Sequence, residues 1–286
     1  MSGARAQLLD MECSFPRANS MLRLLEPSDS CRRSLWERLF AGTYDKPFIL
    51  DSGQWRFLHF DLDAVQSAMS LKDPHKLSLA YTRKMMAFLL FNHAPARILL
   101  LGLGGGSLAK FCYRSLPGAA VTAVEMNPDV IRLREEFSIP RDDDRFRVIC
   151  ADGAHYLAHL RRSKDVILAD ACDRAGIAPE LDAIEFYQQV RRVLSQGGVF
   201  VSNMCGDRKN CNAHLSKIQE VFEGHFVTLQ VAPHGNVIVL AFKDSHSQYD
   251  WGKLAATGLN LKQRFSLDFP RYVKRMSLDR KLCRWQ

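Results

Sequence analysis

The feature that most constrains the fold is a regular alternation of short apolar runs and amphipathic segments between residues 97 and 242. The apolar runs predict strands at 97–101, 120–125, 146–150, 165–170, 198–203, 226–231 and 236–242. Helices fit between them at about 105–115, 128–137, 153–161, 183–194 and 211–222. Only a few residues join the last two strands, too few for a crossover helix. The sequence therefore predicts an α/β, Rossmann-like fold whose seven-stranded, mostly parallel sheet ends in an antiparallel hairpin.

The rest of the chain divides into shorter regions. Residues 1–43 mix polar and apolar residues and are expected to be an extension with one short helix at about 34–40. Residues 44–75 are predicted to form a small β-region, because β-rich segments at 48–50 and 54–60 flank a polar turn. An amphipathic helix over 76–92 then opens a catalytic domain spanning 76–245, and 246–286 form a basic C-terminal segment.

Composition limits the protein class and the cellular compartment. With 286 residues and 47% hydrophobic content, the chain can bury a substantial core. The eight cysteines show no Cys-x-x-Cys pair and are expected to be reduced thiols of a cytoplasmic protein. No apolar stretch has the length of a membrane span, and the start of the chain lacks the pattern of a secretion signal. The nine histidines do not combine with other ligands at metal-binding spacing, so no metal site is expected.

The net charge of +8 is concentrated at one end of the chain. Residues 262–286 contain eight basic and two acidic residues, and therefore carry +6 of that charge. Because no aromatic residues interleave with these charges at stacking spacing, the sequence favours a solvated tail over a nucleic-acid partner.

The first strand of the alternating region leads directly into a glycine loop. Gly102, Gly104, Gly105 and Gly106 lack side chains, so the backbone there can approach a ligand closely. Glu125 ends the next strand, where a carboxylate can accept hydrogen bonds from ribose hydroxyls. Dinucleotide enzymes place a third glycine one position further along, which is serine here. The spacing fits better a loop that binds S-adenosylmethionine, although a tight turn that packs a helix on the sheet is the alternative.

Two further strand ends carry acidic residues. Asp170 and Asp173 follow the fourth predicted strand, at the edge where open α/β sheets bind ligands. A carboxylate at this edge can accept a proton from an amine or hold an ammonium group. Asp152 and Gly153 follow the third strand and are expected near an adenine. Each aspartate could instead cap the following helix, and for Asp152 the two roles are compatible.

From about residue 48 to 242 the chain resembles the spermidine synthase family of polyamine aminopropyltransferases, which share the fold of S-adenosylmethionine-dependent methyltransferases. The resemblance rests on motifs that recur in order: Gln66-Ser67, Tyr81-Thr82-Arg83, Gly102 to Ser107, Glu125, Asp152-Gly153, Asp170 to Arg174 and Phe186-Tyr187. It implies transfer of an aminopropyl group from decarboxylated S-adenosylmethionine to a polyamine. Asp170 would then be the catalytic base, with Tyr81, Asp173 and Gln66 binding the acceptor. It also implies a homodimer.

The chain departs from the family at three positions. Gly105 replaces an aspartate that binds the aminopropyl amine, and Thr82 and Arg83 replace a histidine and a glutamate. Less negative charge and an added guanidinium are expected to suit the carboxylate of S-adenosylmethionine better than a cationic arm. Two alternatives follow. One is methyl or 3-amino-3-carboxypropyl transfer from S-adenosylmethionine to a small molecule or to RNA. The other is a non-catalytic relative of the family.

Overall fold

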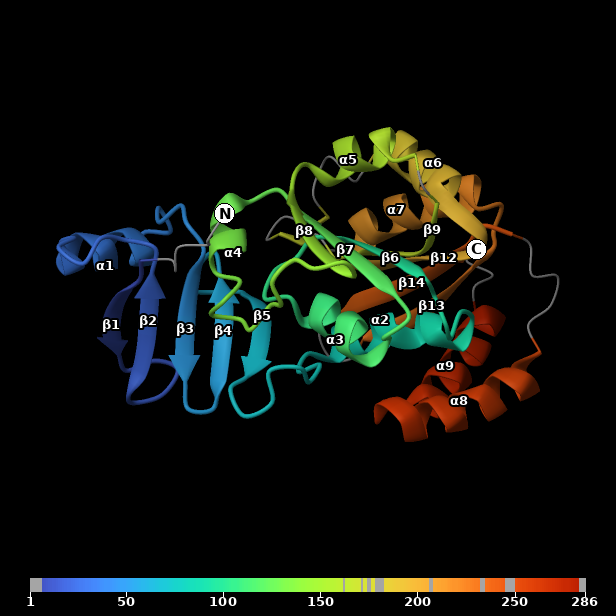
Figure 1. Cartoon of the computed structure of the whole chain (residues 1–286), viewed down its shortest axis with the longest axis horizontal. Coiled ribbons are helices and arrows are strands. Elements are labelled where there is room, and N and C mark those ends of the chain that lie inside the picture. Colours follow the sequence, from blue (N-terminus) through green and yellow to red (C-terminus); the bar gives the residue numbers. More distant parts are fainter. Residues whose placement is uncertain are drawn as a thin grey trace.

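The computed structural model describes residues 7–161, 163–170, 172–173, 176–177, 183–205, 208–231, 235–244 and 250–282. An N-terminal five-stranded sheet stands beside a seven-stranded sheet that has helices on both faces (Figure 1). A short antiparallel pair, β10 (Cys172–Asp173) and β11 (Gly176–Ile177), follows the fourth strand of the larger sheet.

The N-terminal sheet includes residues that the sequence assigned to an extension. Its strands follow one another in chain order and are β1 (Leu9–Cys13), β2 (Ser20–Leu24), β3 (Phe48–Ser52), β4 (Trp55–His59) and β5 (Val65–Ser70). The predicted hairpin is β3 and β4, and the predicted short helix is α1 (Arg32–Phe40). The boundary at residues 43 and 44 is wrong, because β2 pairs with β3 across it. The alternating apolar residues of β1 and β2 are too few and too interrupted to stand out, but they become buried once the strands pair.

The seven-stranded sheet confirms the predicted α/β fold. Its order is β13-β14-β12-β9-β6-β7-β8. The strands are β6 (Arg97–Leu101), β7 (Ala120–Glu125), β8 (Phe146–Cys150), β9 (Lys164–Ala169), β12 (Leu194–Met204), β13 (Phe226–Val231) and β14 (Asn236–Phe242). β14 runs antiparallel to both of its neighbours, while β12, β9, β6, β7 and β8 are parallel. The first residues of β14 therefore lie at the same edge as the last residues of the parallel strands.

Helices cover both faces of this sheet. α5 (Gly153–His159), α6 (Ile184–Val193) and α7 (Arg208–Val221) lie on one face (Figure 1). The opposite face carries α2 (Ala80–Met85), a 3₁₀ helix (Met86–Leu90) and α3 (Ser107–Ser115). The predicted helix over 128–137 is shorter than expected. α4 (Pro128–Arg132) ends early because the backbone changes to 3₁₀-type hydrogen bonds between an N–H and the carbonyl three residues earlier, such as Arg134 N–H to the Ile131 carbonyl.

The basic C-terminal segment is not a solvated tail. It forms α8 (Trp251–Phe265) and α9 (Phe269–Leu282), which pack together beside the helical face formed by α2 and the 3₁₀ helix (Figure 1). Leu261, Phe269 and Met276 are buried, whereas Arg271, Lys274 and other basic residues are exposed. The amphipathic pattern anchors the segment, and its charges face solvent.

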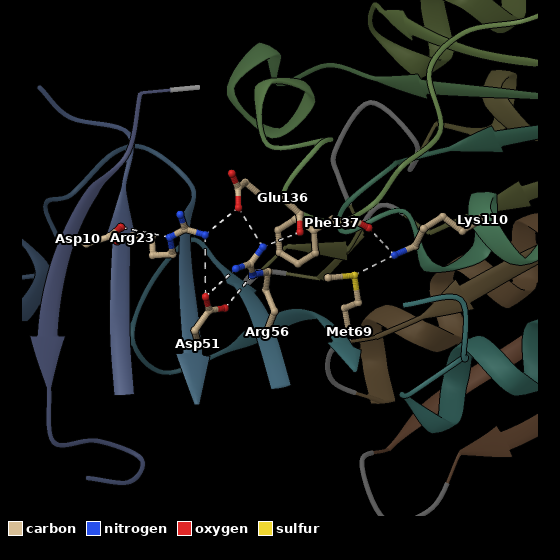
Figure 2. A network of polar contacts seen from close by, with 8 residues as sticks. All are labelled: Asp10, Arg23, Asp51, Arg56, Met69, Lys110, Glu136 and Phe137. Atoms are coloured by element: carbon tan, nitrogen blue, oxygen red, sulfur yellow. Dashed lines mark hydrogen bonds and ion pairs between the residues drawn. The ribbon is translucent and has the colours of Figure 1, made fainter. Parts of the chain in front are cut away.

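An ionic network joins the N-terminal sheet to the seven-stranded domain (Figure 2). Glu136 accepts hydrogen bonds from Arg23 of β2 at 2.7 Å and from Arg56 of β4 at 2.9 Å. Arg56 also forms a two-point ion pair with Asp51, with both N–O distances 2.7 Å. These side chains are largely buried, so the network holds the two sheets in a defined relative position.

The cysteines of the described residues are not all free thiols. Cys112 and Cys211 are buried free thiols, and Cys31 and Cys150 are exposed ones. Cys205 is disulfide-bonded, which corrects the expectation of reduced thiols throughout. Within the described ranges, no helix is both long and apolar enough to cross a membrane.

Candidate adenosyl-binding and transfer site

A cavity of about 610 Å³ lies at the carboxyl edge of the parallel strands. Its walls come from both sheets, since β4, β5 and the loop between them contribute residues, as do the ends of β6, β7 and β9. Ligand sites of open α/β sheets occur at this edge. Predicted site residues from several elements between residues 66 and 170 meet here: Gln66, Tyr81, Gly102, Gly104, Glu125, Asp152, Gly153 and Asp170.

The glycine loop reaches the cavity with only some of its residues. Gly102 and Gly104 line it, and both have positive φ angles, of 95° and 50°. This backbone conformation is one that only glycine adopts readily. Gly105 and Gly106 do not line the cavity. A Cβ at Gly106 would collide with Ile139, so this glycine permits close packing of α3.

Glu125 is held by the backbone at the end of β7. Its Oε2 accepts a hydrogen bond from the Leu103 N–H at 3.0 Å, and its Oε1 accepts one from the Asn127 N–H at 2.9 Å. A carboxylate oxygen can accept more than one hydrogen bond, so both oxygens can still receive ligand donors. The arrangement fits a pair of adjacent ribose hydroxyls.

Asp152 combines the two roles that the sequence left open. Its Oδ1 accepts a hydrogen bond from the His155 N–H at 2.6 Å, which caps the N-terminus of α5. The same residue lines the cavity together with Gly153. The cap therefore fixes the carboxylate at the cavity wall.

Asp170 follows β9 and is hydrogen-bonded to two other residues of the cavity. Its Oδ1 accepts a hydrogen bond from Asn203 Nδ2 at 2.9 Å, and it is also hydrogen-bonded to the Tyr81 hydroxyl. Burial raises the pKa of Asp170, while these two hydrogen bonds act in the opposite direction. The pKa of Tyr81 lies well above its ordinary value because of burial and the neighbouring carboxylate. The side chain of Asp173 lies outside the described residues, and its backbone belongs to β10.

The cavity is lined by acidic side chains and, within the described part of the chain, by no basic one. Glu125, Asp152 and Asp170 line it, whereas Arg83 does not. Arg83 donates hydrogen bonds to the Leu77 carbonyl at 2.9 Å and the Ser78 carbonyl at 2.6 Å. The expectation that this guanidinium makes the pocket less suited to cations is therefore wrong. A cavity of this charge attracts ammonium and sulfonium groups.

The space beside Gly105 is closed to a side chain. A Cβ built there would lie 2.7 Å from Ser67 Oγ and 3.0 Å from Phe137 Cδ1. Its φ angle is not in the positive range, so packing rather than backbone conformation restricts this position. An aspartate could stand here only if Ser67 moved.

Asn203 and Asn236 also line the cavity, and the sequence did not predict them as site residues. Asn203 lies near the end of β12, and Asn236 begins β14. The available signal was topological. The end of a central parallel strand and the start of an antiparallel strand both reach the ligand-binding edge, so a polar residue at either place is a candidate.

Comparison with known proteins identifies the family of the chain. The family model of the spermine/spermidine synthase domain matches residues 78–233, which is just over half of the chain. The chain belongs to the spermine/spermidine synthase family. A polyamine aminopropyltransferase of Chromobacterium violaceum is 41% identical over 229 residues, covering 80% of this chain and 88% of that protein. One from Neisseria meningitidis is 39% identical, covering 79% and 86%.

Solved structures show the same fold within and beyond the family. A probable spermidine synthase from Corynebacterium glutamicum superposes with a TM-score of 0.62 at 23% identity, covering 74% of this chain and 84% of the other. Human methyltransferase-like protein 13 in complex with SAH gives a TM-score of 0.60 at 24% identity, covering 66% and 93%. The family thus shares its architecture with methyltransferases.

Proposed function

We propose that this protein transfers an aminopropyl group from decarboxylated S-adenosylmethionine to an amine of a polyamine. The observation that carries the proposal is the charge of the cavity, where three carboxylates and no described basic side chain surround the space. Donor and acceptor are both cations, and the carboxylates of such a cavity attract them. The relatives named polyamine aminopropyltransferase support the same activity.

The donor would lie along the strand ends. Gly102 and Gly104 offer backbone without side chains, Glu125 accepts from the ribose hydroxyls, and Asp152 with Gly153 borders the adenine. Gly105 and Gly106 would support this loop through its packing on Ser67 and Ile139. No step of the proposed reaction requires a metal or a redox cofactor.

The reaction is a single displacement. The neutral acceptor amine attacks the carbon next to the sulfonium, so a C–N bond forms as the C–S bond breaks, and methylthioadenosine leaves with the electron pair. Asp170 takes the proton that the amine loses, and its raised pKa suits a base at this position. Tyr81, Gln66 and Asp173 would hold the acceptor in line with the reacting carbon.

A second candidate is transfer from S-adenosylmethionine itself, as a methyl or a 3-amino-3-carboxypropyl group, to a small molecule or RNA. The observation that favours it is Gly105, where the family's aspartate for the aminopropyl amine is absent and Ser67 closes the space. A non-catalytic relative is the third candidate.

Titration calorimetry with S-adenosylmethionine, its decarboxylated form and methylthioadenosine separates the three. We expect at least tenfold tighter binding of the decarboxylated donor than of S-adenosylmethionine. The opposite preference would support the second candidate, and no binding of any of the three would support the third. A product assay with putrescine then tests the acceptor. Asp170→Asn should lower turnover by about 10²–10⁴-fold, whereas the exposed Asp144→Asn should not; unchanged turnover in Asp170→Asn would remove Asp170 as the base.

The oligomeric state, the location and the class of acceptor are part of the proposal. From the family resemblance we expect a homodimer located in the cytoplasm, acting on a small-molecule acceptor rather than on nucleic acid or a membrane. Sedimentation velocity of the purified chain tests the dimer, and a single monomeric species at micromolar concentration would refute it.

A further inference from the structure

Three side chains from separate strands form a hydrogen-bonded row that ends at the proposed base. Asn236 Nδ2 donates to Asn203 Oδ1 at 3.0 Å, and Asn203 Nδ2 donates to Asp170 Oδ1 at 2.9 Å. Asp170, Asn203 and Asn236 come from the end of β9, from β12 and from the start of β14, which are neighbours in the sheet. All three line the cavity.

The direction of the row follows from chemistry. An ionised carboxylate can only accept, so the amide nitrogen of Asn203 must face Asp170. Its amide oxygen then faces Asn236, which must donate. Each amide thereby fixes the orientation of the next, and a rotation of either would place two donors or two acceptors against each other. Asn203 is itself only 4% exposed, so water cannot readily replace a lost partner.

We propose that Asn203 and Asn236 are positioning residues for the transfer reaction, with Asn236 orienting Asn203 and Asn203 holding the Asp170 carboxylate toward the acceptor amine. This inference rests on the proposed function, because it assumes that Asp170 receives the proton. Asn236 lies at the far end of the row and acts through its neighbour, so its effect depends on Asn203 being present. Neither residue is required to touch the reacting atoms.

Other groups near Asp170 also bear on its protonation. From α2, Tyr81 shares a hydrogen bond with it. Glu125 of β7 and Asp152 before α5 are the other described carboxylates that line the cavity. The side chain of Asp173 falls outside the described residues. The test therefore needs a signal that belongs to Asp170 alone.

Carboxyl ¹³C NMR of aspartate-labelled protein provides that signal, assigned by its absence in Asp170→Asn. In Asn203→Leu the carboxylate loses a donor, so the pKa of Asp170 should rise by about one unit, a tenfold change in proton affinity. Asn236→Leu should raise it less. The double variant should match Asn203→Leu alone. The exposed Asn212→Leu on α7 serves as the matched control and should leave the signal unchanged.

Each outcome decides the proposal. An unchanged pKa of Asp170 in Asn203→Leu would overturn the proposal. If Asn236→Leu still shifts the pKa of Asp170 in the Asn203→Leu background, Asn236 does not act through Asn203. Because NMR needs no turnover, a failure here is distinguishable from a failure of the proposed activity. In the active enzyme, the acidic limb of the kcat/KM profile should move to higher pH in step with the NMR values. Asn203→Gln, which retains the amide, should restore part of the wild-type profile.

Discussion

Lys110 and Phe137 are joined by a hydrogen bond of 2.6 Å from the buried Lys110 Nζ to the Phe137 carbonyl oxygen (Figure 2). The ammonium lies where α3 meets the N-terminal sheet, and its second contact is the Met69 sulfur at 3.2 Å. It forms no ion pair with a described carboxylate, and the residue is 1% exposed. Burial lowers the pKa of Lys110 to about 7.

This buried lysine predicts how stability varies with pH. Between pH 7 and about 10.5 the unfolded chain binds a proton at Lys110 that the folded chain does not, so folding stability rises with pH across this window. Lys110→Met removes the cost of burying the amine and should stabilise the protein by about 1–4 kcal/mol near pH 7. The gain should shrink toward pH 10. Urea unfolding from pH 6.5 to 10, with the exposed Lys72→Met as control, measures it; a pH-independent difference would contradict the assignment.

The ionic network between the sheets predicts a large effect from one substitution. Glu136 is 12% exposed and pairs with both Arg23 and Arg56. Glu136→Gln removes one of the two carboxylates that both guanidinium groups contact, the other being Asp51. We therefore expect a loss of about 2–4 kcal/mol in the free energy of unfolding. Glu37→Gln removes an exposed pair with Arg33 and should cost less than about 1 kcal/mol. Similar losses of unfolding free energy in the two variants, measured by urea unfolding, would show that the network does not hold the two sheets together.

Packing at Gly105 predicts a pair of coupled substitutions. Gly105→Ala brings a Cβ to 2.7 Å from Ser67 Oγ and should cost about 1–3 kcal/mol. Adding Ser67→Gly should recover part of that loss, since it removes the Ser67 Oγ and Cβ atoms that lie 2.7 and 3.0 Å from the new Cβ. Gly118→Ala, with no atom within 4 Å of its Cβ, should change stability by less than about 1 kcal/mol. If the stability effects of Gly105→Ala and Ser67→Gly are additive in a double-mutant cycle, the new Cβ does not clash with Ser67.

Asp152 allows its structural and binding roles to be separated. Serine is as good an N-cap as aspartate, so Asp152→Ser should change stability by less than about 0.5 kcal/mol while weakening binding of the adenosyl ligand. Asp152→Ala should also lose the cap, at about 0.5–2 kcal/mol. Asp250→Ala removes the equivalent cap of α8, away from the cavity, and should lower stability without changing affinity. Calorimetry and thermal unfolding of the three variants test this, and full affinity in Asp152→Ser would exclude a ligand contact.

Much of the fold and part of the site could be predicted from the sequence, because they depend on local patterns. Continuous apolar runs such as 98–101 are typical of strands buried on both faces, and parallel strands place their carboxyl ends at one edge. Glu125 and Asp170 follow such runs directly, so their meeting at the cavity needed no knowledge of side-chain packing. The strands at 9–24 were missed because their apolar residues become meaningful only through pairing with β3.

Other features depend on the direction that an individual side chain takes, which the hydrophobic pattern does not contain. Arg83 stands two residues after Tyr81, yet its guanidinium binds the carbonyls of Leu77 and Ser78 instead of lining the cavity. The direction of a long side chain is set by the hydrogen-bond partners around it.

The glycine loop shows the same division within a few residues. The sequence by itself determined that residues 102–106 form a turn after a buried strand, with the carboxylate of Glu125 at the end of the next strand, because strand periodicity and missing Cβ atoms are local properties. Only the tertiary structure decided that Gly105 is closed by Ser67 of the N-terminal sheet and that Asn203 and Asn236 stand in a row behind Asp170. These relationships join residues that lie more than 30 positions apart, and only the folded chain brings them within hydrogen-bonding or packing distance.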